Sequence, residues 1–118
     1  MDIVLEELSR NMPASTTKDL VYYVSTTGSN NNDGLTAEKP FFSVAKALSR
    51  LPKIIDHDIT IYAANGKYVE DINISGFSGT GSISIIGDIN NPRNVIFYSI
   101  VVSDCFCAVN ILGMKFLK

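Results

Sequence analysis

Short apolar runs recur through the second half of the chain and are separated by turn residues. Most of these runs alternate isoleucine or valine with a small polar residue. Their middle residues fall at positions 61, 73, 85, 97 and 110, so that successive runs are 12 or 13 residues apart. Strand-like runs at this spacing predict either a β-sandwich or a β-solenoid. The runs occupy residues 59–62, 72–74, 83–86, 95–98 and 109–112.

Two features favour the solenoid. The alternation is typical of side chains that stack inward in successive coils. Two-residue hairpin turns of the Asn-Gly type are scarce, and only Asn65-Gly66 qualifies. Two strands per coil predict roughly two dozen residues per coil and about two and a half coils in the chain. We expect Ile61, Ile74, Ile85 and Ile111 to point into the stack.

The first part of the chain predicts a different kind of structure. Residues 1–19 are expected to form an N-terminal helix and a linker, because Leu5 and Leu8 have helical spacing and Pro13 would end the helix. Residues 20–118 are expected to form one domain, since the length leaves no room for a second sizeable core.

A strand, an ordered loop and a helix are predicted ahead of the repeated runs. Residues 20–24 are β-branched and aromatic, which indicates a strand. The Asn30-Asn31-Asn32-Asp33 segment is followed by a glycine and predicts a tight, ordered loop. A helix with one apolar face is expected over residues 41–51, with Pro52 ending it. Its apolar face would carry Phe41, Val44 and Leu48.

These segments resemble the N-terminal motif of the pectate-lyase-like superfamily, and the resemblance covers about residues 21 to 90. The matching residues are Tyr22-Tyr23-Val24-Ser25, Gly28-Ser29-Asn30, Asn32-Asp33-Gly34-Leu35-Thr36, Pro40-Phe41, Ala45 and Ala47-Leu48. The segments that are similar to the first coil of that family are Ile59-Thr60-Ile61-Tyr62, Gly66-Lys67-Tyr68 and Ile72-Asn73-Ile74.

The resemblance implies a mostly β fold, namely a short right-handed parallel β-helix with an N-terminal capping α-helix. The strand at 22–24 and the helix at 41–51 would cover the first coil, which otherwise presents unpaired N–H and C=O groups. The motif occurs in phage tailspikes and neck appendages, in polysaccharide lyases and hydrolases, and in bacterial surface proteins. The tailspike members imply a homo-oligomer, a trimer, and a cell-surface polysaccharide as partner.

Charge and composition exclude several classes of partner. Twelve acidic residues against ten basic ones give a net charge of −2, and the basic residues are scattered, so no nucleic-acid partner is expected. No apolar run approaches the roughly 20 residues that span a bilayer, so no membrane partner is expected. The acidic N-terminus has no basic n-region, and no signal peptide is seen. We expect the protein in a virion (a phage tail) or outside the cell.

Six carboxylates are of the residue type that supplies acid–base pairs or a calcium site. Enzymes of the resembling family place such groups on later coils, so we expect no catalytic role for these six. Asp88 and Asp104 follow strands at turns, where aspartate is common. The six residues are Asp56, Asp58, Glu70, Asp71, Asp88 and Asp104.

The other candidate residues also have structural interpretations. His57 is predicted to be a solvated loop residue. The side-chain oxygens of the Asn30-Asn31-Asn32-Asp33 segment could bind a cation, but we expect this segment to form an ordered turn instead. Cys105 and Cys107 would share one face of a strand as small core residues. Tyrosine rings are of the kind that stacks on sugars, but we expect most of the tyrosines here to pack in the core or at a strand edge. These tyrosines are Tyr22, Tyr23, Tyr62, Tyr68 and Tyr98. No catalytic, cofactor-binding or metal-binding residue is assigned, and no cofactor is expected.

Three hypotheses on function follow. The first is a structural or receptor-binding module of a phage virion, of the tailspike or appendage type. The second is the N-terminal part of a polysaccharide lyase or glycoside hydrolase, which would not act by itself as this fragment. The third is a bacterial surface adhesion module.

Overall fold

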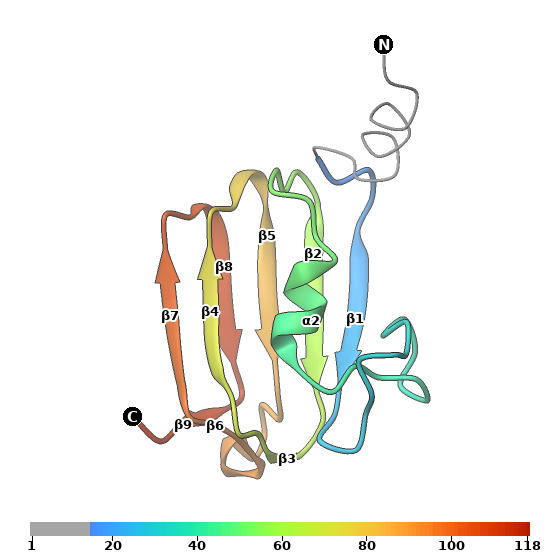
Figure 1. Cartoon of the computed structure of the whole chain (residues 1–118). Coiled ribbons are helices and arrows are strands. Elements are labelled where there is room, and N and C mark those ends of the chain that lie inside the picture. Colours follow the sequence, from blue (N-terminus) through green and yellow to red (C-terminus); the bar gives the residue numbers. More distant parts are fainter. Residues whose placement is uncertain (1–14) are drawn as a thin grey trace.

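The computed structural model describes residues 15–118, and this part of the chain is mostly β with parallel sheets (Figure 1). The N-terminal helix expected around Leu5 and Leu8 lies outside the described residues. Among residues 15–118, no helix reaches the length and apolarity of a membrane span. The helical elements are α2 (Val44–Ser49) and the 3₁₀ turn η1 (Pro92–Asn94). The strands are β1 (Leu20–Val24), β2 (Asp58–Ala63), β3 (Gly66–Lys67), β4 (Asp71–Ser75), β5 (Ser78–Ile86), β6 (Val95–Phe97), β7 (Ser99–Ser103), β8 (Phe106–Leu112) and β9 (Lys115–Phe116).

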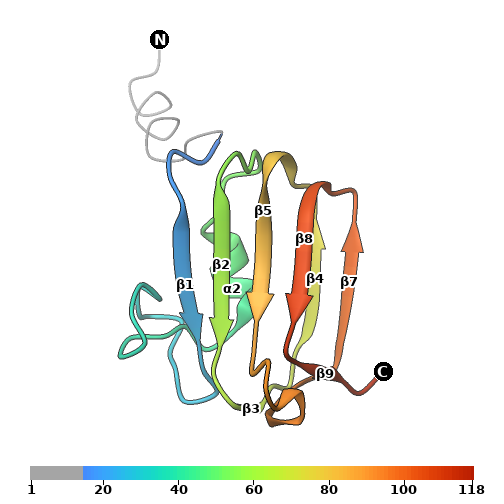
Figure 2. The ribbon, with the colours of Figure 1, turned by 180° about the vertical axis from the view of Figure 1, so that it is seen from behind.

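The strands form three sheets, and every strand pair is parallel. The sheets have the orders β1-β2-β5-β8, β3-β6-β9 and β4-β7. After β1 and α2, the chain enters the three sheets in a fixed order, which gives a first passage (β2, β3, β4), a second passage (β5, β6, β7) and a third passage (β8, β9). Figure 2 shows the four-stranded sheet in front, with α2, β4 and β7 behind it.

Inward-facing side chains of the four-stranded sheet stack in register. Ile61 pairs with Ile85, which pairs with Ile111, and a second row joins Ile59 to Ile83 in the same way. The side chains of Ile61 and Ile85 are fully buried, as predicted, and so is that of Ile74 in β4. Ile111 is only half-buried, because no strand of the described residues pairs with β8 on its other side. Each such burial contributes about 1.5–3 kcal/mol.

Aromatic rings form a third stack beside the three-stranded sheet. The rings of Tyr68 and Phe97 are stacked with centroids 4.3 Å apart, and Phe116 follows at 6.4 Å from Phe97. Offset-stacked and tilted aromatic pairs add about 0.5–1.5 kcal/mol beyond their buried area. One aromatic residue of each passage therefore takes part in the core at this corner.

The predicted pairing of strands is wrong in one respect, because each complete passage has three strands and not two. With two strands per coil, the run at 95–98 would pair with the run at 72–74, but β6 pairs with β3 and the partner of β4 is β7. The connection that contains η1 lengthens the second passage, so that 28 residues separate Ile72 from its partner Ile100. In the four-stranded sheet, the separation from Ile59 to Ile83 is 24 residues, which agrees with the predicted repeat.

The helix α2 is shorter than the predicted helix over residues 41–51. Ser43 is its N-cap and accepts a hydrogen bond from the Lys46 N–H, while Phe41 forms a parallel bridge with Val24. The side chains of Phe41, Val44 and Leu48 are buried, as the apolar face predicted. The helix packs beside β4 and against β1 and β2 (Figure 1), so it covers the core ahead of the first passage.

The loop between β1 and α2 is an ordered turn, as predicted. Its backbone is tied to β1, since the Tyr23 N–H donates to Gly34 O at 2.8 Å and the Phe41 N–H donates to Tyr23 O at 2.8 Å. Gly34 has a φ of 69°, and a Cβ there would collide with the ring of Phe41. The loop thus needs glycine for its backbone conformation and for its packing.

Substitution of Gly34 separates these two requirements. Gly34→Ala should destabilise the fold by the left-handed cost of about 1–2 kcal/mol and by a further cost of moving the Phe41 ring. Gly76→Ala is the matched control, since Gly76 has a φ of 78° but its Cβ would meet only the Lys53 Nζ at 3.8 Å. Urea unfolding of both variants gives the comparison. Equal losses in the two variants would contradict the packing role assigned to Phe41.

Candidate functional site

The six candidate carboxylates are spread over the structure, and most of them accept hydrogen bonds that hold the backbone or a neighbouring strand. The carboxylates of Asp58 and Asp71 accept from Ser82 Oγ at 3.0 Å and Ser99 Oγ at 2.7 Å, across paired strands. Asp88 accepts from two backbone N–H groups of the loop that follows β5. Within residues 15–118, no three His, Cys, Asp or Glu side chains gather closely enough to hold a metal ion.

Asp56 and Asp104 occupy turns, and His57 differs from its prediction. Asp56 accepts from the Thr80 N–H at 3.2 Å, and Asp104 has a positive φ of 51°. His57 was predicted to be solvated, but it is half-buried and its Nδ1 lies 2.8 Å from Thr16 Oγ1. The hydroxyl of Thr16 also accepts from the Asp56 N–H. His57 therefore helps to fasten the segment before β1 to the segment before β2.

The two cysteines lie near the third passage. Both thiols are free and half-buried, and both side chains pack against the core. Burial and the neighbouring Cys105 raise the pKa of the Cys107 thiol, and a raised pKa disfavours the reactive thiolate. The prediction of core residues is therefore confirmed in part, because neither side chain is fully enclosed.

The tyrosines divide between the core and the outer surface. Tyr22 and Tyr68 are buried, while Tyr23 and Tyr62 stack on each other with centroids 5.6 Å apart on the outer face of β1 and β2. The Tyr68 hydroxyl donates to the carbonyl of Ala64 at 2.6 Å. Burial, and then the charge of Glu70, raise the pKa of Tyr68 well above its usual value, so this phenol stays protonated.

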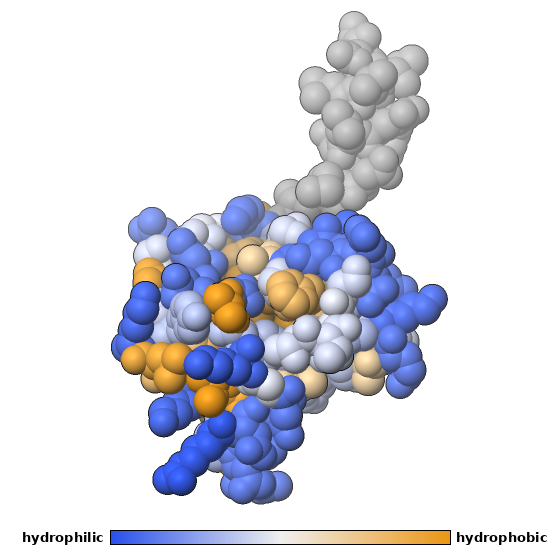
Figure 3. Space-filling model, turned by 60° about the horizontal axis from the view of Figure 1, so that its bottom comes forward, coloured by the Kyte–Doolittle hydropathy of each residue, from blue (hydrophilic) through white to orange (hydrophobic). Residues whose placement is uncertain are grey.

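A hollow of about 370 Å³ lies at the start of α2, beside β3 and the segment that enters β4. Two of its side chains are apolar and largely exposed, with Phe42 at 54% and Val69 at 77%. The space-filling view in Figure 3 brings this end of the molecule forward and shows apolar groups gathered among hydrophilic ones. The hollow is lined by Thr26, Phe42, Ser43, Ala45, Lys67, Tyr68, Val69 and Glu70.

Glu70 forms the inner polar wall of this hollow. Its carboxylate accepts hydrogen bonds from the Val44 N–H at 3.1 Å and the Ala45 N–H at 2.8 Å, which are free backbone donors of the first turn of α2. Burial raises the pKa of Glu70, and the two N–H bonds partly oppose that shift. The side chain thereby joins α2 to the strand β4 that it precedes.

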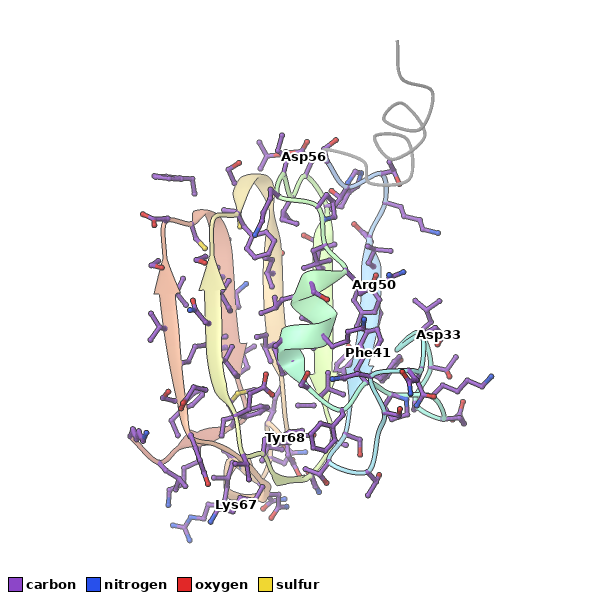
Figure 4. All side chains as sticks on the ribbon, in the orientation of Figure 1. Asp33, Phe41, Arg50, Asp56, Lys67 and Tyr68 are labelled. Carbon is purple, nitrogen blue, oxygen red and sulfur yellow. The ribbon has the colours of Figure 1, made fainter. Side chains whose placement is uncertain are left out.

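The chemistry of the hollow suits a ligand with an apolar face and a polar edge. Phe42 and Val69 offer apolar surface, while the Thr26 and Ser43 hydroxyls and the Lys67 ammonium offer hydrogen bonds. Figure 4 shows Lys67 and Tyr68 together at this end of the molecule, below α2. Small-molecule sites are commonly concave and mostly apolar, with a few polar groups of this kind and a titratable group of perturbed pKa.

The sequence did not indicate this hollow. Glu70 was among the candidate carboxylates, but Phe42 and Val69 carried no recognised pattern. The lining residues come from segments around 26, 42–45 and 67–70, and only the passage of the chain through the three sheets brings these segments together. The one available signal was an aromatic residue, Phe42, that lies off the predicted apolar face of the helix.

Comparison with family models, with curated proteins and with solved structures finds no match to this chain. The resemblance to the pectate-lyase-like superfamily stays a prediction from the sequence motif.

The raised pKa of Glu70 predicts a pH-dependent contribution to stability. Because the folded state favours the protonated carboxyl, stability from this group is present below the unfolded pKa of 4.5 and is lost as pH rises through the higher folded pKa. The free energy of unfolding of the wild type, minus that of Glu70→Gln, should therefore fall as pH rises through this range. Urea unfolding of both proteins at a series of pH values measures this difference.

Val69→Ala is the control for this measurement, because it changes an exposed neighbour of Glu70 and leaves every ionisable group in place. The difference in the free energy of unfolding between the wild type and Val69→Ala should not vary with pH. A difference between the wild type and Glu70→Gln that is constant with pH, or that grows as pH rises, would contradict the assignment.

Proposed function

We propose that this chain is the capped N-terminal part of a right-handed parallel β-helix that serves as a structural or receptor-binding module, of the phage tailspike or appendage type. The observation that carries the proposal is the in-register parallel pairing of successive passages in all three sheets, covered on one side by α2 and β1. Sheets that repeat in a fixed order around one core are typical of β-solenoids.

The right-handed path rests on a general rule. Connections between parallel strands of one sheet are right-handed in roughly 98% of cases. Here β2 connects to β5, and β5 to β8, through strands of the two other sheets. A stack of this kind extends by adding passages, and long rigid stacks suit a fibre or appendage.

The proposal includes assembly into a trimer. The last strands, β7 and β8, and the residues after β9 leave large apolar side chains exposed, and monomeric proteins rarely present such surface along unpaired strand edges. Neighbouring copies that pack against this side would cover it, and light scattering would then give about three times the chain mass of 12.9 kDa. The exposed residues are Val101, Val102, Phe106, Leu112 and Leu117.

Recognition is proposed at the hollow beside α2, with a sugar of a cell-surface polysaccharide as its ligand. A pyranose ring has an apolar face, which would pack on Phe42, and hydroxyl groups at its edge, which would bind Ser43, Thr26 and Lys67 of the same hollow. Most candidate carboxylates are engaged in hydrogen bonds of the fold, as described above, so a recognition role is better supported than a hydrolytic one.

The test is binding of the chain to an array of bacterial surface polysaccharides. At least one polysaccharide should bind, and Phe42→Ala should weaken that binding by about 1–3 kcal/mol, since stacking on an aromatic ring is lost. Leu35→Ala is the matched control, because Leu35 is 53% exposed and lies outside the hollow. The recognition role is refuted if no polysaccharide binds, or if the two variants bind equally well.

A further inference from the structure

A second hollow, of about 410 Å³, lies on the other side of the segment that leads into α2. One wall is the helix, which contributes Lys46 and Arg50, and the facing wall is the loop of residues 30–33. Figure 4 shows Arg50 at the C-terminal end of α2 and Asp33 on the loop, on the same side of the helix, with Phe41 between these two elements. Unlike the first hollow, this one is lined mainly by polar side chains.

Lys46 lies on α2 and Arg50 is its C-cap residue, one turn further along, so the two cations repel each other. Like charges at positions i and i+4 destabilise a helix by about 0.2–0.5 kcal/mol. The hydrogen bonds that involve Lys46 use its backbone N–H and C=O, and its ammonium has no partner among residues 15–118. The helix therefore holds two positive groups at the mouth of one hollow, where a bound anion would relieve the repulsion.

The facing loop is held rigidly by its own side chains. Asn30 Oδ1 accepts from the Phe42 N–H at 2.9 Å, and Asn32 Nδ2 donates to the Pro40 carbonyl at 2.8 Å. The side-chain amide of Asn31 is exposed and makes no hydrogen bond within the described part of the chain, since only the Asn31 backbone N–H is bonded, to Ser29 Oγ. Asn31 thus offers a free NH₂ donor on a fixed backbone.

We propose that this hollow binds the oxyanion group of a small ligand, a carboxylate, sulfate or phosphate, through Lys46, Arg50 and Asn31. The guanidinium of Arg50 presents paired donors that fit two oxygens of such a group, and Lys46 adds a point charge. Asp33 also lines the hollow and accepts from the Leu35 N–H at 3.0 Å. Two cations against one carboxylate leave the hollow positive.

The test is an NMR titration of the ¹⁵N-labelled chain with sodium sulfate, sodium phosphate and sodium acetate. Ionic strength is kept constant with sodium chloride, because simple screening would otherwise shift many amide signals. At least one of these anions should cause saturable shifts in the amides of residues 30–33 and 43–50. Saturation with sulfate or phosphate alone identifies a tetrahedral oxyanion as the ligand group, and saturation with acetate alone identifies a carboxylate.

Variants decide whether the named side chains hold the anion. Arg50→Gln and Lys46→Gln should each raise the Kd about tenfold or more, since each removes a charge-assisted hydrogen bond. Lys115→Gln, which removes the same charge from β9, should leave the Kd unchanged. The proposal is overturned if no anion gives saturable shifts at these residues, or if Lys115→Gln raises the Kd as much as Arg50→Gln does.

Discussion

Parallel pairing in register is the constraint on which the rest of this structure depends. Each strand of a passage must lie on the equivalent strand of the passage before it, so that Ile61 meets Ile85 and Tyr68 meets Phe97. A shift of one residue would turn these side chains outward and expose the apolar row. The short strands have little stability of their own, and the stacked inward side chains supply the burial that holds the three sheets together.

A stack of this kind needs an element that covers the exposed strands at each end. At the end ahead of the first passage, that element is the helix α2. The helix α2 lies where a strand before β4 would lie, but a helix presents no row of backbone donors and acceptors to β4. Glu70 compensates in part by binding the free N–H groups of Val44 and Ala45. The loop of residues 25–41 completes the cover, and the two hollows form on either side of the place where this loop meets α2.

The main elements of the fold could be predicted because inward positions repeat. The rows through Ile59 and Ile61 have strict alternation, and β1 is β-branched and aromatic, so these strands were found. The strand β7 was missed because Ile100, Val101 and Val102 lack alternation, and β3 because a two-residue strand carries no periodic signal. The predicted helix begins too early because Phe41 is apolar and buried, as a residue on the inner face of a helix would be. In the structure Phe41 lies ahead of α2 and forms a parallel bridge with Val24.

The candidate sites were less predictable than the fold for a physical reason. A hollow is lined by residues that are distant in sequence, and its position depends on how the passages are joined. The Lys46 and Arg50 spacing was visible, but the facing Asn31 could be placed only from the structure. Carboxylates attracted attention by residue type, and five of the six accept hydrogen bonds that hold a strand, a loop or the helix in place.

The central claim is that consecutive passages stack in parallel and in register. The most direct measurement is a set of nuclear Overhauser effects in the ¹³C,¹⁵N-labelled chain. The account predicts backbone contacts from Thr60 to Ser84 and from Ser84 to Asn110, which lie in paired positions of β2, β5 and β8. Backbone contacts of an antiparallel hairpin between the consecutive strands β4 and β5, in place of these, would contradict it.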